Sequence, residues 1–225
     1  MEQNEIIEAL KAKGVVFKNA ASNLIDADVE MGAGAVIYPG VVIEGKSSIG
    51  EGTVLRTGCA LRDCVIGARC ELIYVVGEKA AVGDDVKIGP FVNLRPGTSI
   101  KNKCKVGDFV EIKNSNIGEG SKLPHLSYIG DADVGERVNV GCGCVFVNYD
   151  GFDKHRTVVG NDVFLGCQTN LVAPVSVGDD AFTAAGSTIT EDVPAGAFAI
   201  ARNRQTNKPG WVEKYRALKR GKENT

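Results

Sequence analysis

An aliphatic side chain recurs at every sixth position along most of this chain of 225 residues. The step is regular from residue 82 to residue 112, where it falls on Val82, Ile88, Leu94, Ile100, Val106 and Ile112. A glycine directly follows many of these aliphatic residues. A period of six fits neither an α-helix nor the two-residue alternation of an ordinary β-strand. It is typical of a hexapeptide solenoid, in which each coil uses about eighteen residues and three short parallel strands.

The repeat divides the chain into three parts. Residues 25–190 carry it and predict one continuous all-β solenoid, with an irregular stretch at 72–81 and a ten-residue interruption at 148–157. The interruption does not fit the six-residue step, so it has to project from the solenoid as an exposed loop. Loops on a rigid scaffold commonly carry binding residues. Residues 1–24 are expected to form a short amphipathic helix and a linker, and residues 191–225 an extension with a basic helix. The 28 glycines are expected at corners, where the backbone turns sharply.

Composition argues against several classes of partner. The formal net charge of −2 gives no reason to expect a nucleic-acid or membrane-surface partner. No run of apolar residues is long enough to span a bilayer, and the charged N-terminal segment does not read as a secretory signal. Seven scattered cysteines without a C-x-x-C pair predict reduced thiols and a cytoplasmic location.

Few residues could carry chemistry. The chain has two histidines, His125 and His155, and His125 could equally be an ordinary surface residue. Arg95 and Lys113 are eighteen residues apart, so one should stack on the other in the next coil. Such a pair makes sense if an anion such as phosphate lies between the two cations, or else both side chains are solvated and lean apart. Phosphate-loop, dinucleotide-binding and nucleophile-elbow motifs are missing from the sequence, which argues against those chemistries.

Several motifs, in order, resemble one bacterial enzyme family. They are residues 88–97 (IGPFVNLRPG), 106–113 (VGDFVEIK), 125–132 (HLSYIGDA), 148–154 (NYDGFDK) and 159–178 (VGNDVFLGCQTNLVAPVSVG). These motifs are similar to the acetyltransferase domain of the bifunctional N-acetylglucosamine-1-phosphate uridyltransferase/glucosamine-1-phosphate acetyltransferase, GlmU. The likeness extends over about residues 5–208. It implies a left-handed parallel β-helix, a homotrimer with active sites between subunits, and no metal.

The same resemblance implies a reaction. Acetyl would pass directly from acetyl-CoA to the amine of glucosamine 1-phosphate, in the route to UDP-N-acetylglucosamine. The family's nucleotidyltransferase half has no counterpart in this sequence. Uridyltransferase activity is therefore expected to be absent, and a separate nucleotidyltransferase would have to supply that step.

Residue roles follow from the aligned motifs. His125 matches the general base, and an imidazole has a pKa near neutrality, as removal of a proton from an amine requires. The amino-sugar phosphate site is implied to contain Arg95, Lys113, Tyr128, Asn139 and Lys154. The acetyl-CoA site is implied to contain Cys142, Asn148, Tyr149, Cys167, Ala185 and Arg202. A backbone N–H near Cys142 is the implied donor to the oxyanion.

Three cysteines depart from the family pattern. Cys142, Cys144 and Cys167 stand where a small or hydroxyl-bearing residue is usual, and Cys167 in place of serine should weaken a contact to the cofactor. A cysteine nucleophile is the covalent alternative to direct transfer. It is disfavoured because the sequence shows no partner base for either Cys142 or Cys167.

Three rival functions stay open at this point. The chain could be a paralogue that acylates another amino-sugar phosphate or a nucleotide sugar. A metal-dependent hydratase of the carbonic-anhydrase type would need three histidines around zinc, and the chain has two. A non-catalytic hexapeptide-repeat trimer would need none of His125, Lys113, Asn139 and Lys154.

Overall fold

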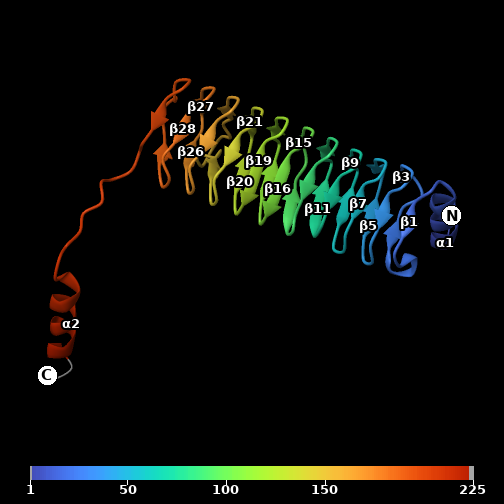
Figure 1. Ribbon diagram of the computed structural model, residues 1–225, viewed down its shortest axis with the longest axis horizontal. Helices are drawn as coiled ribbons and strands as arrows, with labels where there is room; N and C mark the ends of the chain where they lie inside the picture. Colours follow the sequence, from blue (N-terminus) through green and yellow to red (C-terminus); the bar gives the residue numbers. More distant parts are fainter. Residues whose placement is uncertain (1, 223–225) are drawn as a thin grey trace.

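The protein is a three-sided prism of stacked coils, seen in a computed structural model that describes residues 2–222 (Figure 1). The coils make about 10 turns of a left-handed parallel β-helix, which confirms the fold class predicted from the repeat and the family resemblance. Helix α1 (Gln3–Ala12) lies at one end. Helix α2 (Trp211–Lys222) lies beyond the other end, at the tip of an extended segment.

Within the described residues the strands form three parallel sheets, one for each side of the prism. The 11-stranded sheet contains, in spatial order, β1 (Val16–Phe17), β4 (Val36–Ile37), β7 (Val54–Leu55), β10 (Glu71–Leu72), β13 (Lys87–Ile88), β16 (Lys105–Asp108), β19 (Lys122–His125), β22 (Asn139–Val140), β25 (Phe164–Leu165), β28 (Phe182–Thr183) and β30 (Phe198–Ala199). The 10-stranded sheet contains β2 (Leu24–Ile25), β5 (Val42–Glu44), β8 (Ala60–Arg62), β11 (Val75–Glu78), β14 (Val92–Leu94), β17 (Glu111–Lys113), β20 (Tyr128–Gly130), β23 (Val145–Val147), β26 (Asn170–Val172) and β29 (Thr188–Ile189). The 9-stranded sheet contains β3 (Glu30–Met31), β6 (Ser48–Ile49), β9 (Val65–Ile66), β12 (Ala81–Val82), β15 (Ser99–Ile100), β18 (Asn116–Ile117), β21 (Ala132–Val134), β24 (Thr157–Val159) and β27 (Val175–Val177).

The sixth-position aliphatic residues form the core. Leu94 and Ile112, for example, are partners in the register between β14 and β17, and neither side chain is exposed to solvent. Their neighbours in sequence, Asn93 and Glu111, point outward, as the alternation of side chains along a strand requires. The irregular stretch 72–81 keeps this register, because Gly77 takes the inward position of β11 between Leu61 and Leu94.

Strand pairing continues on both sides of the range 25–190 inferred from the repeat. β1 pairs with β4, and β30 pairs with β28. These end strands are two residues long, and their inward positions hold Phe17 in β1 and Ala199 in β30, so no Val, Ile or Leu marks them in the sequence.

Many glycines that follow an inward aliphatic residue allow close stacking of the coils. A Cβ atom on Gly83 would lie 2.9 Å from the backbone nitrogen of Asn102 in the next coil. At several corners of the coils, the residue with a positive φ is not glycine but a residue with a side chain, such as Arg69 with φ 54° and Phe91 with φ 58°. From the sequence, these glycines are expected at sharp turns. The structure gives close approach between coils as the reason at these positions.

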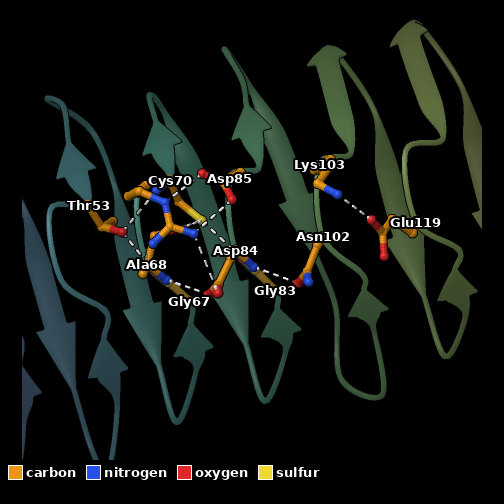
Figure 2. Close-up of polar contacts among 11 residues, drawn as sticks. Thr53, Gly67, Ala68, Cys70, Gly83, Asp84, Asp85, Asn102, Lys103 and Glu119 are labelled. Carbon is orange, nitrogen blue, oxygen red and sulfur yellow. Dashed lines mark hydrogen bonds and ion pairs between the residues drawn. The ribbon is translucent and has the colours of Figure 1, made fainter.

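Asp and Asn side chains close one corner of the prism by capping the adjacent coil (Figure 2). The Asp84 carboxylate accepts a hydrogen bond from the Ala68 backbone N–H at 2.8 Å, and the Asn102 side chain accepts one from the Asp84 backbone N–H at 2.8 Å. An ion pair between Lys103 and Glu119 at 2.7 Å continues along the next coils. The two hydrogen bonds to the Asp84 and Asn102 side chains satisfy backbone N–H groups that the strands leave unpaired at the turn.

The two helices relate differently to the prism. Ile6, Ile7 and Leu10 of α1 are buried, and Ile6 and Leu10 join the core, so α1 covers the first coil. In α2 the apolar residues Trp211 and Tyr215 stack on each other and remain exposed. Neither helix, among the residues described, is long and apolar enough to cross a membrane.

Candidate functional site

His125 lies on the edge between the 11-stranded and 10-stranded sheets. It is the last residue of β19, and the register places Asp108 of β16 beside it in the preceding coil. The ring Nδ1 is 2.8 Å from Asp108 Oδ1, and the imidazole side chain is 54% exposed. The hydrogen bond with His125 lowers the pKa of Asp108. With the proton on Nδ1, the ring donates to this carboxylate and keeps Nε2 as its proton acceptor.

Gly107 allows the two coils that carry this pair to come together. A Cβ atom at position 107 would lie 1.9 Å from the carbonyl oxygen of Pro124, directly before His125. Any side chain at position 107 would therefore push apart the strands that bring Asp108 and His125 within hydrogen-bonding distance.

Three residues implied in the acetyl-CoA site follow His125 along the same edge, one in each successive coil. The pairings of Val140 with Leu165 and of Leu165 with Thr183 align Cys142, Cys167 and Ala185. The backbone N–H of Gln168 donates to the carbonyl of Cys142 at 2.7 Å. Cys142 is partly exposed and Cys167 is exposed. We call the row Asp108, His125, Cys142, Cys167 and Ala185 the His125 edge.

Arg95 and Lys113 lie on the adjacent 10-stranded sheet in neighbouring coils, as their spacing predicts. Each already has a carboxylate partner. Arg95 Nη1 is 2.9 Å from Glu111 Oε1, and Lys113 Nζ is 3.2 Å from Asp131 Oδ2. The stacking of these two cations therefore does not by itself require a bound anion, which corrects the reason given from the sequence.

Lys154 adds a third cation from the loop 148–157. The loop folds back on itself through an antiparallel bridge between Tyr149 and Lys154. The neighbouring ammonium of Lys113 lowers the pKa of Lys154, with a smaller contribution from Arg95. Three cations thus gather around two carboxylates, Glu111 and Asp131, so that among these five side chains the cations outnumber the carboxylates by one. We call Arg95, Lys113 and Lys154 the cation cluster.

Tyr128 and Asn148 lie next to this cluster, over Gly130. A Cβ atom on Gly130 would be 2.4 Å from the hydroxyl of Tyr128 and 2.8 Å from Nδ2 of Asn148. Asn148 is buried, and its carboxamide donates to Asp131. Gly130 therefore makes room for both side chains on the face that carries the cation cluster.

The remaining candidates are Asn139, Arg202 and Tyr149, and each has a different place in the single chain. Asn139 points outward from the 11-stranded sheet, on the other side of the His125 edge. Arg202 follows β30 and is exposed, and the register of β28 with β30 places it one coil beyond Gly186, at the end of the His125 edge. The Tyr149 hydroxyl donates to the Gly151 carbonyl at 2.6 Å, which fastens the loop, and Tyr149 is largely exposed.

Metal ligands are not gathered in the part of the chain that the structure describes. No group of three His, Cys, Asp or Glu residues there could hold a metal ion. His155 is 2.8 Å from Asp150 within the loop 148–157, and so pairs with the turn of its own loop.

Two residues of the site are missing from the sequence-based candidates: Asp108 beside His125, and Asp131 beside Lys113. Both lie one coil from their partners, seventeen and eighteen residues away along the chain. Because residues seventeen or eighteen apart lie in neighbouring coils, this spacing could have predicted both pairs from the sequence.

Comparison with known proteins places the chain in a family. Residues 79–114 match the family model of the bacterial transferase hexapeptide (six repeats). The bifunctional protein GlmU of Caldicellulosiruptor saccharolyticus is 54% identical over 201 residues, covering 89% of this chain and 43% of the relative. This chain is a hexapeptide-repeat homologue of GlmU. The GlmU of Caldanaerobacter subterraneus subsp. tengcongensis is 52% identical over 220 residues, covering 98% of this chain and 48% of the relative.

The likeness to GlmU has a defined extent. The chain spans less than half the length of these two relatives. Among solved structures, a UDP-N-acetylglucosamine acyltransferase from Arabidopsis matches with a TM-score of 0.58 at 18% identity, over 89% of this chain and 75% of that one. At that identity the match concerns the fold of the β-helix.

Proposed function

We propose that this protein is an acetyl-CoA-dependent N-acetyltransferase that acts on an amino-sugar 1-phosphate, with glucosamine 1-phosphate as its first candidate. The observation that carries the proposal is the His125–Asp108 pair at 2.8 Å, on an edge that borders a cluster with excess positive charge. A base beside an anion-binding surface suits an acceptor that carries both an amine and a phosphate.

The proposed chemistry begins at His125. Asp108 accepts the Nδ1 hydrogen, so Nε2 can take the proton that the amine loses as it attacks the thioester carbonyl. The carbonyl oxygen gains negative charge in this step, and a backbone N–H near Cys142 is the proposed donor to it. Collapse of the intermediate forms the amide and releases the CoA thiol.

The cation cluster is the proposed phosphate subsite. Arg95 and Lys113 can keep their ion pairs with Glu111 and Asp131 when a phosphate dianion binds. The phosphate would then meet the excess charge contributed by Lys154. Hydrogen bonds between charged groups are typically worth about 1.5–3 kcal/mol each, enough to make binding depend on the phosphate.

The open His125 edge supports a site completed by other copies of the chain. The exposed residues Tyr74, Phe91, Phe109 and Leu126 form a ridge that ends beside His125. The ring centroids of Tyr74 and Phe91 are 5.0 Å apart, and those of Phe91 and Phe109 are 5.3 Å apart. Exposed apolar strips of this kind commonly mark interfaces. A homotrimer would bury the ridge and could bring Asn139 or Arg202 of one subunit to the site of another.

A substrate panel tests the proposal. Release of CoA thiol from acetyl-CoA should be fast with glucosamine 1-phosphate, and kcat/KM should be about 10²-fold lower with glucosamine, because the phosphate contacts are lost. Galactosamine 1-phosphate and an amino-sugar nucleotide complete the panel and test the paralogue alternative. Equal rates with and without the phosphate would contradict the role of the cation cluster. Acetyl-CoA binding without turnover on any amino sugar would support the non-catalytic trimer.

The structure bears on the covalent alternative as well, because Cys142 lies one coil beyond His125 on the same edge. Direct transfer predicts that Cys142→Ala keeps kcat within about threefold of wild type, since alanine preserves the small side chain. A covalent route predicts loss of turnover in Cys142→Ala. It also predicts an acetylated Cys142 peptide in wild-type protein quenched after mixing with acetyl-CoA alone. Mass spectrometry of that peptide separates the two routes.

A further inference from the structure

Asp131 is a buried carboxylate between the cation cluster and the loop 148–157. Only 7% of the residue is exposed. Its carboxylate accepts hydrogen bonds from Lys113 Nζ at 3.2 Å, from Asn114 Nδ2 at 2.6 Å and from the Asn148 carboxamide. Burial raises the pKa of Asp131, but these donors outweigh the burial and hold its pKa below the usual range. Asp131 is therefore ionised at neutral pH.

The backbone of Asp131 is fixed as firmly as its side chain. Its N–H donates to the Lys113 carbonyl at 3.0 Å, and its carbonyl accepts from the Thr157 N–H at 3.1 Å. Its φ of 50° is left-handed, a conformation that Asp and Asn adopt more readily than most residues. One residue thus touches the strand that carries Lys113 and both ends of the loop, at Asn148 and at Thr157.

We propose that Asp131 is a positioning residue that holds the ammonium of Lys113 and the carboxamide of Asn148 in one fixed arrangement. The inference rests on the proposed acetyltransferase function, in which Lys113 serves the acceptor and Asn148 the donor. A lysine ammonium on its flexible stem, close to a second ammonium at Lys154, would otherwise turn away. By holding both groups, Asp131 aligns the acceptor phosphate with the donor before either one binds.

Two simpler roles make different predictions. If Asp131 were only a counter-charge, its carboxylate would repel the bound phosphate. Removal of that carboxylate would then tighten phosphate binding. As a mere anchor for the loop, Asp131 would act like Asp133, whose carboxylate accepts from Arg156 Nη2 at 2.6 Å and from Asn116 Nδ2 at 2.6 Å. Asp133 is two residues further along, on strand β21, and has no hydrogen bond to Lys113 among those of the described residues. It is therefore a matched control.

The test compares Asp131→Asn and Asp133→Asn in the full chain. Asparagine fits the left-handed backbone at position 131, but its single side-chain oxygen cannot hold Lys113, Asn114 and Asn148 together. We expect Asp131→Asn to lower kcat at least tenfold, with KM for the 1-phosphate acceptor changed by less than threefold. Asp133→Asn should keep kcat within threefold, even where its melting temperature falls. A lower acceptor KM at unchanged kcat in Asp131→Asn, or an equal loss of kcat in both variants, would overturn the proposal.

A second measurement does not depend on turnover. Reductive methylation with formaldehyde, followed by peptide mass spectrometry, reports the accessibility of each lysine. In wild type the Lys113 side chain is only 18% exposed and bonded to Asp131, so it should react slowly. Asp131→Asn should speed the methylation of Lys113 at least fivefold, and Asp133→Asn should not. Faster methylation of Lys113 in Asp131→Asn would support positioning even if the protein acetylated no amino sugar. Unchanged Lys113 reactivity would refute positioning by Asp131 and would leave the proposed acetyltransferase function untouched.

Discussion

His125→Ala is expected to lower kcat for acetyl transfer by about 10²–10⁴, the usual contribution of a general base. The imidazole is more than half exposed and forms one side-chain hydrogen bond, to Asp108, so its loss should cost little stability. Alanine removes the group that would accept the amine proton and leaves the cation cluster intact. Thiol release at saturating acetyl-CoA and glucosamine 1-phosphate gives kcat. Sedimentation shows whether the proposed trimer survives.

His155 supplies the matched control for that experiment. It is the other histidine of the chain, and its ring is 2.8 Å from Asp150 in the loop. His155→Ala should keep kcat within about threefold, because the proposed chemistry assigns this ring no proton transfer. Full activity in His125→Ala, with sedimentation unchanged from wild type, would refute the assignment of the base.

The sequence period was sufficient to predict the core. Leu94 and Ile112 recur at a spacing that only stacked coils explain, and both are buried in register. The period could not reveal the end strands, because Phe17 and Ala199 take the inward positions of β1 and β30, which still pair with the coil beside them. Strand pairing is a backbone property, so it can extend past the side chains that signal it.

The candidate site was only partly accessible to the same reasoning. Counting eighteen residues placed Arg95 beside Lys113, but it assigned no partners to them, and the structure pairs them with Glu111 and Asp131. Carboxylates on a solenoid face are common, and which one turns toward a lysine depends on side-chain packing rather than on spacing. The position of Asn139 on another sheet also needed the structure, because it depends on how coils are divided among three sides.

Leu94→Asp is expected to destabilise the fold by about 5 kcal/mol or more, which approaches the whole stability of an ordinary domain. Leu94 has no solvent exposure and lies between Gly77 and Ile112 in the core of the 10-stranded sheet. Aspartate at this position would lose the buried aliphatic contacts and place a carboxylate among apolar side chains. Because each coil is stabilised by its neighbours, the damage should spread to adjacent coils. Urea unfolding followed by circular dichroism gives the free energy of unfolding.

Two further variants keep this prediction testable if Leu94→Asp does not fold. Leu94→Ala leaves a cavity without a charge and should cost about 3 kcal/mol. Asn93→Asp introduces the same carboxylate one residue earlier, on the outward side of β14, and should change the free energy of unfolding by less than about 1 kcal/mol. The difference between Asn93→Asp and Leu94→Asp then compares the same carboxylate at an outward and an inward position, and Leu94→Ala gives the part that is due to the lost leucine contacts. Equal stability of these two aspartate variants would mean that position 94 does not face a packed interior, and the assignment of inward and outward positions along the repeat would be wrong.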